Sequence, residues 1–262
     1  MPPVTGDWLY KYRMLTEKVK NLNIDEKKFE QLFTPEVHSV ADVLRKYGFD
    51  ARVVGGAVRD FIRGQDPRDI DFATDADPSE LIYMFNMEDI PHDDKGIGHG
   101  TVKAVFGGGK VDVTSIAYKL ELKDGKIRAV TGQDWEQDAQ DRDLTINSMS
   151  INKDGVLYDY TGGLDDLRNQ RVVMLPHTHD KITNDPHLIM RWFKALGYFD
   201  NPRWPKQDFE IIKRHMPLLA KIKGDEKTDR ELSSIMRGKN GQKIIRMMCS
   251  AGADKYLGIN CD

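Results

Sequence analysis

Two aspartates at alternating positions carry the clearest chemical signature in the sequence. Asp69 and Asp71 alternate with Ile70 and Phe72. On a β-strand this alternation sends both carboxylates to one face and both apolar side chains to the other. Neighbouring carboxylates repel each other, and a divalent cation relieves that repulsion; Mg²⁺ carrying substrate phosphates is the common arrangement. The pair therefore predicts a phosphate-handling site with Mg²⁺ as its cofactor.

A glycine turn precedes this pair. The β-branched residues 53–54 stop at Gly55 and Gly56, and a short amphipathic segment follows. This order predicts a strand, a turn and a helix. Glycines let a phosphate approach the backbone, and a helix start offers unpaired N–H groups and a positive dipole end. Arg59, one turn into the helix, adds a cation. We therefore expect Gly55, Gly56 and Arg59 to bind the phosphates of a nucleotide.

A third carboxylate, Asp112, lies in a segment where the period changes to two. Between Thr101 and Ile116 apolar residues alternate with polar ones, and the glycines at 107–109 form a turn. This pattern predicts a β-hairpin. Asp112 faces away from its apolar neighbours on the returning strand. It is either a solvated surface residue or an acid that joins the Asp69–Asp71 pair.

The string Gly-Gly-x-Val-Arg-Asp at residues 55–60, followed by Asp-x-Asp, resembles the head domain of the class II tRNA nucleotidyltransferases. These are the CCA-adding enzymes, grouped with bacterial poly(A) polymerases in the polymerase-β-like nucleotidyltransferase superfamily. The resemblance implies a third catalytic acid on the hairpin, so we favour Asp112 in that role. It further implies that Asp69, Asp71 and Asp112 hold two Mg²⁺ ions. One ion would activate the attacking 3′-hydroxyl and the other would neutralise the triphosphate.

A second stretch strengthens the resemblance. We expect residues 134–149 to be helical, and they contain Arg142, Asp143 and Asn147 at the spacing of the family motif Arg-Arg-Asp-Phe/Leu-Thr-x-Asn-Ala/Ser. By resemblance, Arg142 contacts the nucleotide phosphates and Asn147 supports the ribose side. Asp141 stands where the family usually has its first arginine, which replaces a cation with an anion. The segment Ile97–Thr101 also matches a family signature at the entry to the hairpin.

A third stretch corresponds to the family's neck helix, whose pattern is Glu-Asp-x-x-Arg-x-x-Arg. Asp185 and Arg191 match it, Lys194 conserves a charge, and Asn184 replaces the glutamate. In CCA-adding enzymes the aspartate and the first arginine of this motif read the Watson–Crick edges of the incoming CTP or ATP. The resemblance therefore places Asp185, Arg191 and Lys194 in the base pocket.

Leu188 departs from this pattern because it stands at the position of the base-reading arginine. Leucine cannot donate a hydrogen bond to a base, and a site built to hydrogen-bond its substrate loses discrimination when one partner is removed. His187 is one residue earlier, and helical geometry turns it about 100° away. The departure puts the programme of adding C and then A in question.

The pattern of elements predicts an α+β protein. We expect a polymerase-β-like head with a mixed sheet of about five strands and flanking helices, followed by an all-α neck and body. The predicted domains are an N-terminal helical extension (1–33), the nucleotidyltransferase head (34–176) and a helical domain that binds bases and RNA (177–262). Helix starts are predicted at Thr34-Pro35 and Asp77-Pro78. Further expectations are helices at 8–20, 25–33, 178–197, 206–221, 227–238 and 240–251, strands at 156–160 and 171–175, and a flexible excursion at 117–133.

Composition narrows the classes of function. The 262 residues have a formal net charge of −3, so an RNA-binding surface would be local. From residue 203 to residue 246 there are twelve Lys and Arg against six Asp and Glu, which is either a solvated helical face or an RNA backbone track. No apolar run approaches the roughly 20 residues of a membrane span. Cys249 and Cys261 indicate a reducing compartment without disulfides. A cytoplasmic protein is expected.

Two further features carry weaker expectations. His177, His179 and Asp180 lie on a short linker without a third, distant ligand, so we interpret them as surface residues. The resemblance runs from about residue 32 to the end of the sequence and leaves out the further body and tail helices of the family. We therefore expect a compact form, with tRNA, CTP and ATP as partners.

Three functions remain in competition. The first is a tRNA nucleotidyltransferase that adds C and A to the 3′ end of tRNA. The second keeps the chemistry but changes the specificity to C only, A only or any nucleotide, and Leu188 motivates it. The third is a non-catalytic RNA-binding relative, against which the set of three carboxylates argues.

Overall fold

A computed structural model of the protein describes residues 15–22, 26–67, 70–107, 109–116, 118–123, 126–131 and 134–261. These residues form two compact units. The first unit takes in Asn147–Gly162 together with the described residues before Gln140, and the second takes in Gln140–Ile146 and the residues from Gly163 onward. The units do not coincide with the predicted domains, and the functional division at 33 and 176 stays a prediction.

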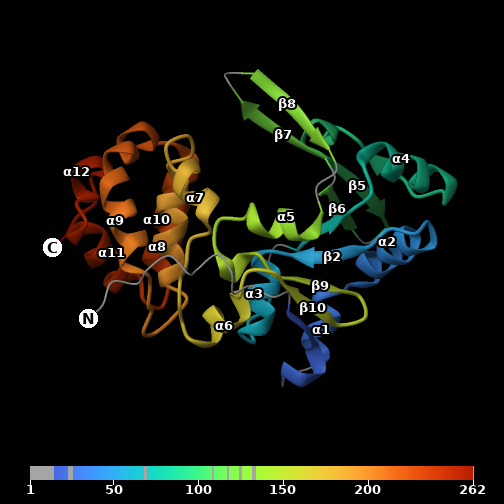
Figure 1. Ribbon diagram of the computed structural model, residues 1–262, viewed down its shortest axis with the longest axis horizontal. Coiled ribbons are helices and arrows are strands. Elements are labelled where there is room, and N and C mark those ends of the chain that lie inside the picture. The colour runs from blue at the N-terminus through green and yellow to red at the C-terminus, as the bar shows by residue number, and fades with distance from the viewer. Residues whose placement is uncertain are drawn as a thin grey trace. The chain divides into compact units, whose positions relative to one another are not determined.

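The first unit is built on a mixed β-sheet, as the sequence predicted (Figure 1). Its order is β1-β10-β9-β2-β3-β6-β5-β4; β3 and β6 are parallel, and the other neighbouring strands are antiparallel. The strands are β1 (Leu15–Lys18), β2 (Ala51–Val54), β3 (Asp71–Thr74), β4 (His92–Asp93), β5 (Thr101–Phe106), β6 (Gly109–Ser115), β9 (Ser150–Asn152) and β10 (Val156–Asp159).

The sheet is larger than the predicted five strands because it gains short strands that a local pattern does not reveal. Within the described residues it has eight, and β1, β4 and β9 have four, two and three residues. The prediction of a helix at 8–20 is wrong over Leu15–Lys18, which pairs with β10. Such short segments become strands through hydrogen bonds to distant parts of the chain, so their own residues carry little periodic signal.

Two predicted helices cover one face of this sheet. Helix α2 (Pro35–Lys46) contacts β2 and β6, and α4 (Pro78–Met87) contacts β5 and α2. Their starts are those predicted: the Thr34 hydroxyl accepts a hydrogen bond from the N–H of Val37, and Asp77 forms a capping box with Glu80. The apolar faces of these helices bury against the alternating apolar side chains of the strands.

The N-terminal segment belongs to the same unit. Helix α1 (Glu26–Leu32) contacts α3 (Gly56–Ile62), and the ring of Phe29 lies 6.2 Å from that of Phe61. The Lys28 ammonium bonds to the carbonyl oxygen of Gly64 at 2.5 Å and to Asp66 at 3.1 Å. The helix thus holds the chain segment that leaves α3.

The prediction of a flexible excursion at 117–133 is wrong for the residues that the structure describes there. Strands β7 (Tyr118–Lys123) and β8 (Lys126–Thr131) form a separate antiparallel pair (Figure 1). Their register sets Leu120 opposite Ala129 and Leu122 opposite Ile127. These apolar residues recur at every second position, a strand pattern that the many charged neighbours obscured.

The predicted helix at 134–149 is shorter than expected. Helix α5 (Trp135–Gln140) ends before the Arg-Asp motif, and only Thr145–Asn147 forms a further 3₁₀ turn, η4. Between them Leu144 makes an isolated bridge with Met174. The predicted strand at 171–175 is likewise reduced to isolated bridges, because Met174 and Arg171 each pair with only one residue.

The second unit is helical, as predicted. The expected helix at 178–197 is divided into α7 and α8, with Pro186 between them, because proline lacks the N–H that a continuous helix needs. Trp192 lies at the centre of the core, with its ring 5.2 Å from Phe193 and 6.0 Å from Trp204 and Phe209. The helices are α6 (Gly163–Arg168), α7 (Pro176–Lys181), α8 (His187–Leu196), α9 (Lys206–His215), η5 (Met216–Ile222), α10 (Glu226–Arg237), α11 (Gly241–Ser250) and α12 (Asp254–Leu257).

A glycine makes the tight corner between α10 and α11. A Cβ at Gly241 would overlap the carbonyl oxygen of Met236 and lie 2.6 Å from that of Ile235. Gly241→Ala should therefore lower the free energy of unfolding by about 3 kcal/mol, since backbone must move to admit the methyl group. Urea denaturation followed by circular dichroism measures this loss. Gly107→Ala is the control, because a Cβ there meets nothing within 4 Å. Equal stability of the two variants would contradict the steric argument.

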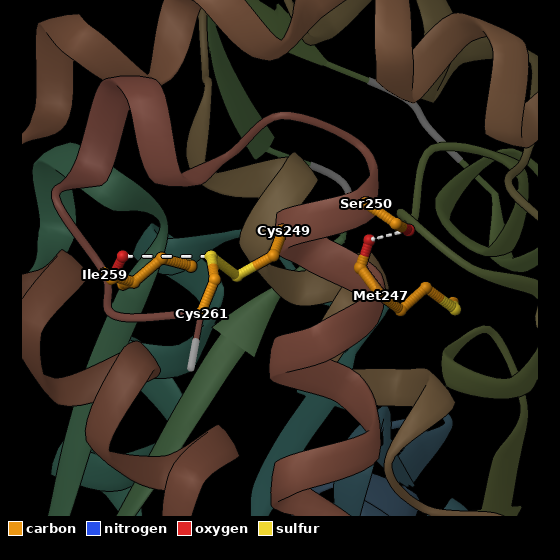
Figure 2. The surroundings of a disulfide bond; sticks show 5 residues. All are labelled: Met247, Cys249, Ser250, Ile259 and Cys261. Atoms are coloured by element: carbon orange, nitrogen blue, oxygen red, sulfur yellow. Dashed lines mark hydrogen bonds between the residues drawn. A yellow bond between two sulfur atoms is a disulfide. The ribbon is translucent and has the colours of Figure 1, made fainter.

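The prediction of unpaired cysteines is wrong. Cys249 and Cys261 form a disulfide, with their Cα atoms 5.9 Å apart (Figure 2). Helix α11 ends at Ser250, and the chain passes through α12 before it returns to α11. Twelve residues of sequence separation hid a pairing that the fold creates.

Reduction of this disulfide should lower the free energy of unfolding by about 2–3 kcal/mol, because it releases a closed loop in the unfolded chain. Thermal unfolding with and without a phosphine reductant measures the change, and thiol titration confirms that the bond is open. The double variant Cys249→Ser/Cys261→Ser should unfold at the same lower temperature as the reduced protein, and the reductant should not change its transition. An unchanged transition of the fully reduced protein would contradict the expectation.

Across the described part of the chain, no helix combines the length and apolar character needed to cross a membrane.

Candidate active site

The glycine turn after β2 requires its first glycine. Gly55 has φ 75° and ψ −136°, a conformation that residues with a side chain rarely adopt. Its N–H donates to the carbonyl oxygen of Met149 at 3.3 Å, which ties the turn to the residue before β9. A Cβ at Gly56 would lie 3.4 Å from Nη2 of Arg59. The two glycines thus allow the backbone to fold closely around the Arg59 guanidinium.

Arg59 is buried, with 8% of its surface exposed. Its Nε and Nη2 donate to the two carboxylate oxygens of Asp60 at 2.9 and 2.8 Å, and its Nη1 donates to Oδ1 of Asn147 at 2.7 Å. The structure therefore joins two residues that the sequence assigned to separate motifs. Asp60, which lies inside the first motif, was not predicted to take part, although an acid beside a buried arginine is a common partner.

Strand register makes Asp71 and Asp112 of the first unit neighbours. In the parallel pair β3–β6, Phe72 is opposite Val113, so Asp71 and Asp112 are neighbours one residue earlier in each strand. Phe72 and Val113 are buried, whereas Asp71 and Asp112 are exposed on the other face. The predicted partnership of these two acids is thus supported by the backbone. Asp69 lies outside the described residues.

A lysine that the sequence reasoning missed stands beside these acids. Lys103 on β5 is directly opposite Asp112, and its ammonium lies 2.8 Å from the Asp112 carboxylate. This hydrogen bond raises the pKa of Lys103 above its ordinary value. Asp93 on β4 is opposite Lys103 on the other side. The alternation of apolar and polar residues in β5 places Lys103 on the same face as Asp112. This alternation was the sequence signal that could have identified Lys103 as part of the site.

The donors present suit a hard divalent cation. Asp71 and Asp112 supply carboxylate oxygens from adjacent strands, and Mg²⁺ in proteins uses one or two carboxylates together with water and substrate phosphates. Among the described residues no group of three or more His, Cys, Asp or Glu is arranged to hold a metal. Asp69, the remaining acid of the predicted set, stands outside that part of the chain. The two acids therefore fit a site that substrate completes.

In the second unit the Arg-Asp motif is held by neutral and charged partners. The Thr178 hydroxyl donates to the carbonyl oxygen of Asp143 at 2.7 Å, and the Asp143 carboxylate lies 3.8 Å from Nη1 of Arg191. Arg142 is half-buried, and its carbonyl oxygen lies 3.4 Å from the same hydroxyl. Asp143 and Arg191, predicted from separate motifs, are thus brought together.

A buried acid anchors Thr145, two residues after Asp143 in this motif. Asp166 on α6 accepts a hydrogen bond from the Thr145 hydroxyl at 2.6 Å and another from Nε of Arg171 at 2.6 Å. Burial raises the pKa of the Asp166 carboxyl, and the hydrogen bonds from Thr145 and Arg171 oppose this shift. The anchor fixes the backbone that follows Arg142 and Asp143.

Helix α8 presents a polar stripe at positions i, i+4 and i+7. His187, Arg191 and Lys194 lie on it and are partly exposed, and Lys194 pairs with Glu231 at 3.1 Å. Leu188 is 7% exposed and packs in the core, so its side chain does not join this stripe.

Asp185 precedes the helix and lies close to His187. Its carboxylate accepts from the N–H of His187 and is 3.2 Å from the ring Nδ1. The other ring nitrogen of His187 lies 3.1 Å from Asp225. The N–H of Thr228 is the main cause that lowers the pKa of Asp225, and His187 contributes to it. His187 therefore connects the start of α8 to the start of α10.

A comparison with known protein families matches the region that contains the glycine turn and the two aspartates. Residues 51–173 match the family described as the poly A polymerase head domain. Residues 51–173 are thus similar to poly A polymerase head domains, in agreement with the family resemblance of the motifs. The match begins at β2 and takes in the glycine turn, Asp71, Asp112 and the Arg-Asp motif.

The similarity to named proteins extends beyond the head domain. The chain is 32% identical over 244 residues to the mitochondrial CCA tRNA nucleotidyltransferase 1 of Danio rerio, covering 92% of this chain and 56% of that protein. It is 32% identical over 218 residues to the CCA-adding enzyme of Bacillus licheniformis, covering 82% of this chain and 53% of that one. The chain thus spans about half the length of the curated relatives it matches.

Solved structures share the fold of the head domain and the helices that follow. The Bacillus stearothermophilus CCA-adding enzyme in complex with CTP has a TM-score of 0.70 and 24% identity, over 86% of this chain and 54% of that one. The Thermotoga maritima CCA-adding enzyme complexed with tRNA has a TM-score of 0.70 and 23% identity, over 92% and 56%. The predicted α+β fold, a polymerase-β-like head followed by helices, is therefore confirmed.

Proposed function

We propose that the chain is a tRNA nucleotidyltransferase that adds C and A to the 3′ end of tRNA from CTP and ATP, with release of pyrophosphate. The observation that carries this proposal is the register of β3 and β6, which sets Asp71 beside Asp112 on an exposed strand face in the region similar to poly A polymerase head domains. The similarity to CCA-adding enzymes supplies the substrate class.

The acids would hold the cofactor. We assign Asp71 and Asp112, with Asp69, to Mg²⁺; the bound ions would lower the pKa of the attacking hydroxyl and neutralise charge on the triphosphate. A carboxylate pair on a strand face is suited to this because its oxygens are fixed by the sheet before substrate arrives. We extend the assignment to Mg²⁺ because carboxylate and phosphate oxygens are its preferred ligands.

The glycine turn and its arginine would bind the nucleotide. Gly55 and Gly56 leave room for close approach to the backbone, and we assign them to the phosphates together with Arg142. Arg59 already bonds to Asp60 and Asn147. We infer that it acts on the nucleotide while it also fixes Asn147, which would then support the ribose.

The start of α8 would recognise the base. We assign this role to Asp185, Arg191 and Lys194, whose side chains are partly exposed. Asp185 can accept hydrogen bonds and the two cations can donate them, so the set offers both halves of a Watson–Crick edge.

A template-altered transferase is the second candidate, because Leu188 is buried at the position of the family's base-reading arginine. Incorporation of each labelled nucleoside triphosphate, singly and in pairs, onto tRNA ending at the discriminator base tests both functions in Mg²⁺. Ordered addition of C, C and A, absent from the Asp69→Ala/Asp71→Ala variant, would support the first. Addition of one nucleotide, or of all four alike, would support the second. No incorporation with any RNA would contradict both.

We infer a cytoplasmic location, since tRNA and nucleoside triphosphates are the proposed substrates; the Cys249–Cys261 disulfide argues against a strongly reducing compartment and therefore against this location. The vertebrate relatives are named mitochondrial, and this is the competing location. Cell fractionation with detection of the native protein decides between them.

A further inference from the structure

A row of alternating charge crosses the exposed face of the sheet beside the proposed metal site. Strand register places Asp71 next to Asp112, Asp112 opposite Lys103, and Lys103 opposite Asp93. Register partners share one face of a sheet, and their side chains are within reach of each other. Lys103 therefore has a carboxylate on each side: one belongs to the proposed metal site and the other, Asp93, does not.

In the structure Lys103 is paired with the metal-site side. Its ammonium is 2.8 Å from one oxygen of Asp112 and 3.2 Å from the other. This pairing offsets the repulsion between Asp112 and Asp71 when no cation is bound. A divalent cation at Asp112 would instead place positive charge beside the ammonium, and the two would repel each other.

Asp93 offers the ammonium a second partner. Its carboxylate accepts a hydrogen bond from the N–H of Lys95 at 3.0 Å, which fixes its position, and lies 3.5 Å from the Lys95 ammonium. That ammonium belongs to a side chain 89% exposed, so its hold on Asp93 is weak. Lysine has a flexible four-carbon stem, so Lys103 can turn from one cross-strand neighbour to the other without a change in the backbone.

We propose that Lys103 is a counter-ion switch for the proposed metal site: it pairs with Asp112 when the metal is absent and moves to Asp93 when the metal binds. This rests on the proposed function, because it takes Asp71 and Asp112 as metal ligands. Before the metal binds, the ammonium of Lys103 partly neutralises the charge of the two aspartates. When the metal binds, Lys103 moves away and leaves the Asp112 carboxylate to the metal. Lys103 and Asp93 are positioning residues in this scheme, since they act on the reaction only through Asp112.

The test is Mn²⁺ binding to the full chain without nucleotide, measured by electron paramagnetic resonance. Lys103→Met should bind Mn²⁺ about tenfold more tightly. This is the order of magnitude expected when the repulsion between one ammonium and a neighbouring divalent cation is removed at a solvent-exposed site. Asp93→Asn should bind it several-fold more weakly, because Lys103 then has no second partner. In the double variant the Asp93→Asn effect should vanish, which identifies the coupling between the two residues.

Two controls separate the failure of this inference from the failure of the proposed function. Lys46→Met removes the same charge from α2, which covers the opposite, buried face of the sheet, and should change the affinity less than twofold. Asp112→Asn should abolish the measured binding. If it does, and Lys103→Met binds no more tightly than wild type, the switch is overturned while the metal site stands. Wild-type binding that Asp112→Asn leaves unchanged would overturn both.

Discussion

Asp71→Asn and Asp112→Asn should each lower nucleotide incorporation by roughly a thousandfold, because under the proposed function each removes an anionic ligand of the metal that neutralises the triphosphate. The two side chains are exposed on the strand face, opposite the buried Phe72 and Val113. Loss of their charge therefore leaves the core intact, and the thermal unfolding temperature should hardly change. Activity and stability are expected to separate at these two positions.

The measurement is the initial rate of labelled nucleotide incorporation over a range of Mg²⁺ concentrations, beside thermal unfolding of the same samples. Asp94→Asn is the matched control, since Asp94 is an exposed acid of the same unit that has no place in the proposed site; it should retain the wild-type rate. A variant at Asp71 or Asp112 with near-normal incorporation would remove that residue from the catalytic set. A variant that loses activity only because it unfolds would appear in the thermal data.

Trp192→Ala should lower the free energy of unfolding by about 3–5 kcal/mol, the cost of emptying a large aromatic site in a packed core. Trp192 is 0% exposed, and its ring contacts those of Phe193, Trp204 and Phe209. Among the described residues its indole N–H has no hydrogen-bond partner. The stabilisation therefore comes from ring packing.

Trp192→Phe is the control for Trp192→Ala. It keeps an aromatic ring and removes the unpartnered N–H, so its cost should be less than half that of the alanine variant. Urea denaturation followed by circular dichroism measures both variants. Arg191 and Lys194 belong to the same helix, α8. Trp192→Ala should therefore also lower nucleotide incorporation to the extent that it unfolds this helix. Similar costs for Phe and Ala would show that the ring contacts do not stabilise the unit as argued.

The site was most predictable where a single local motif specifies both backbone and chemistry. The Gly55-Gly56 turn, the strand before it and the helix after it are all present, and Gly55 has the positive φ that explains its identity. The capped starts at Thr34 and Asp77 were equally clear. Such features depend on residues within one turn of each other, so the sequence contains all the information they need.

The partnerships of the site could be predicted only in part. The alternation around Asp112 indicated its face, and the neighbouring position of Asp71 required the parallel register of β3 and β6. The bond of Lys103 to Asp112 lies within the predicted hairpin, where alternation indicated the shared face and the structure supplied the register. The bond of Arg59 to Asn147 joins residues 88 positions apart, and no periodic pattern encodes it because it depends on the path of the whole chain.

The sequence by itself determined the family resemblance, the α+β class, the glycine turn, the hairpin that carries Asp112 and the departure at Leu188. Each rests on residue identity at short range, where side-chain chemistry and backbone preference act together. Only the tertiary structure decided that Leu15–Lys18 is a strand, that Cys249 bonds to Cys261 and that Lys103 has an acid on either side. These depend on which distant segments lie side by side, and that is decided by the burial of the whole chain.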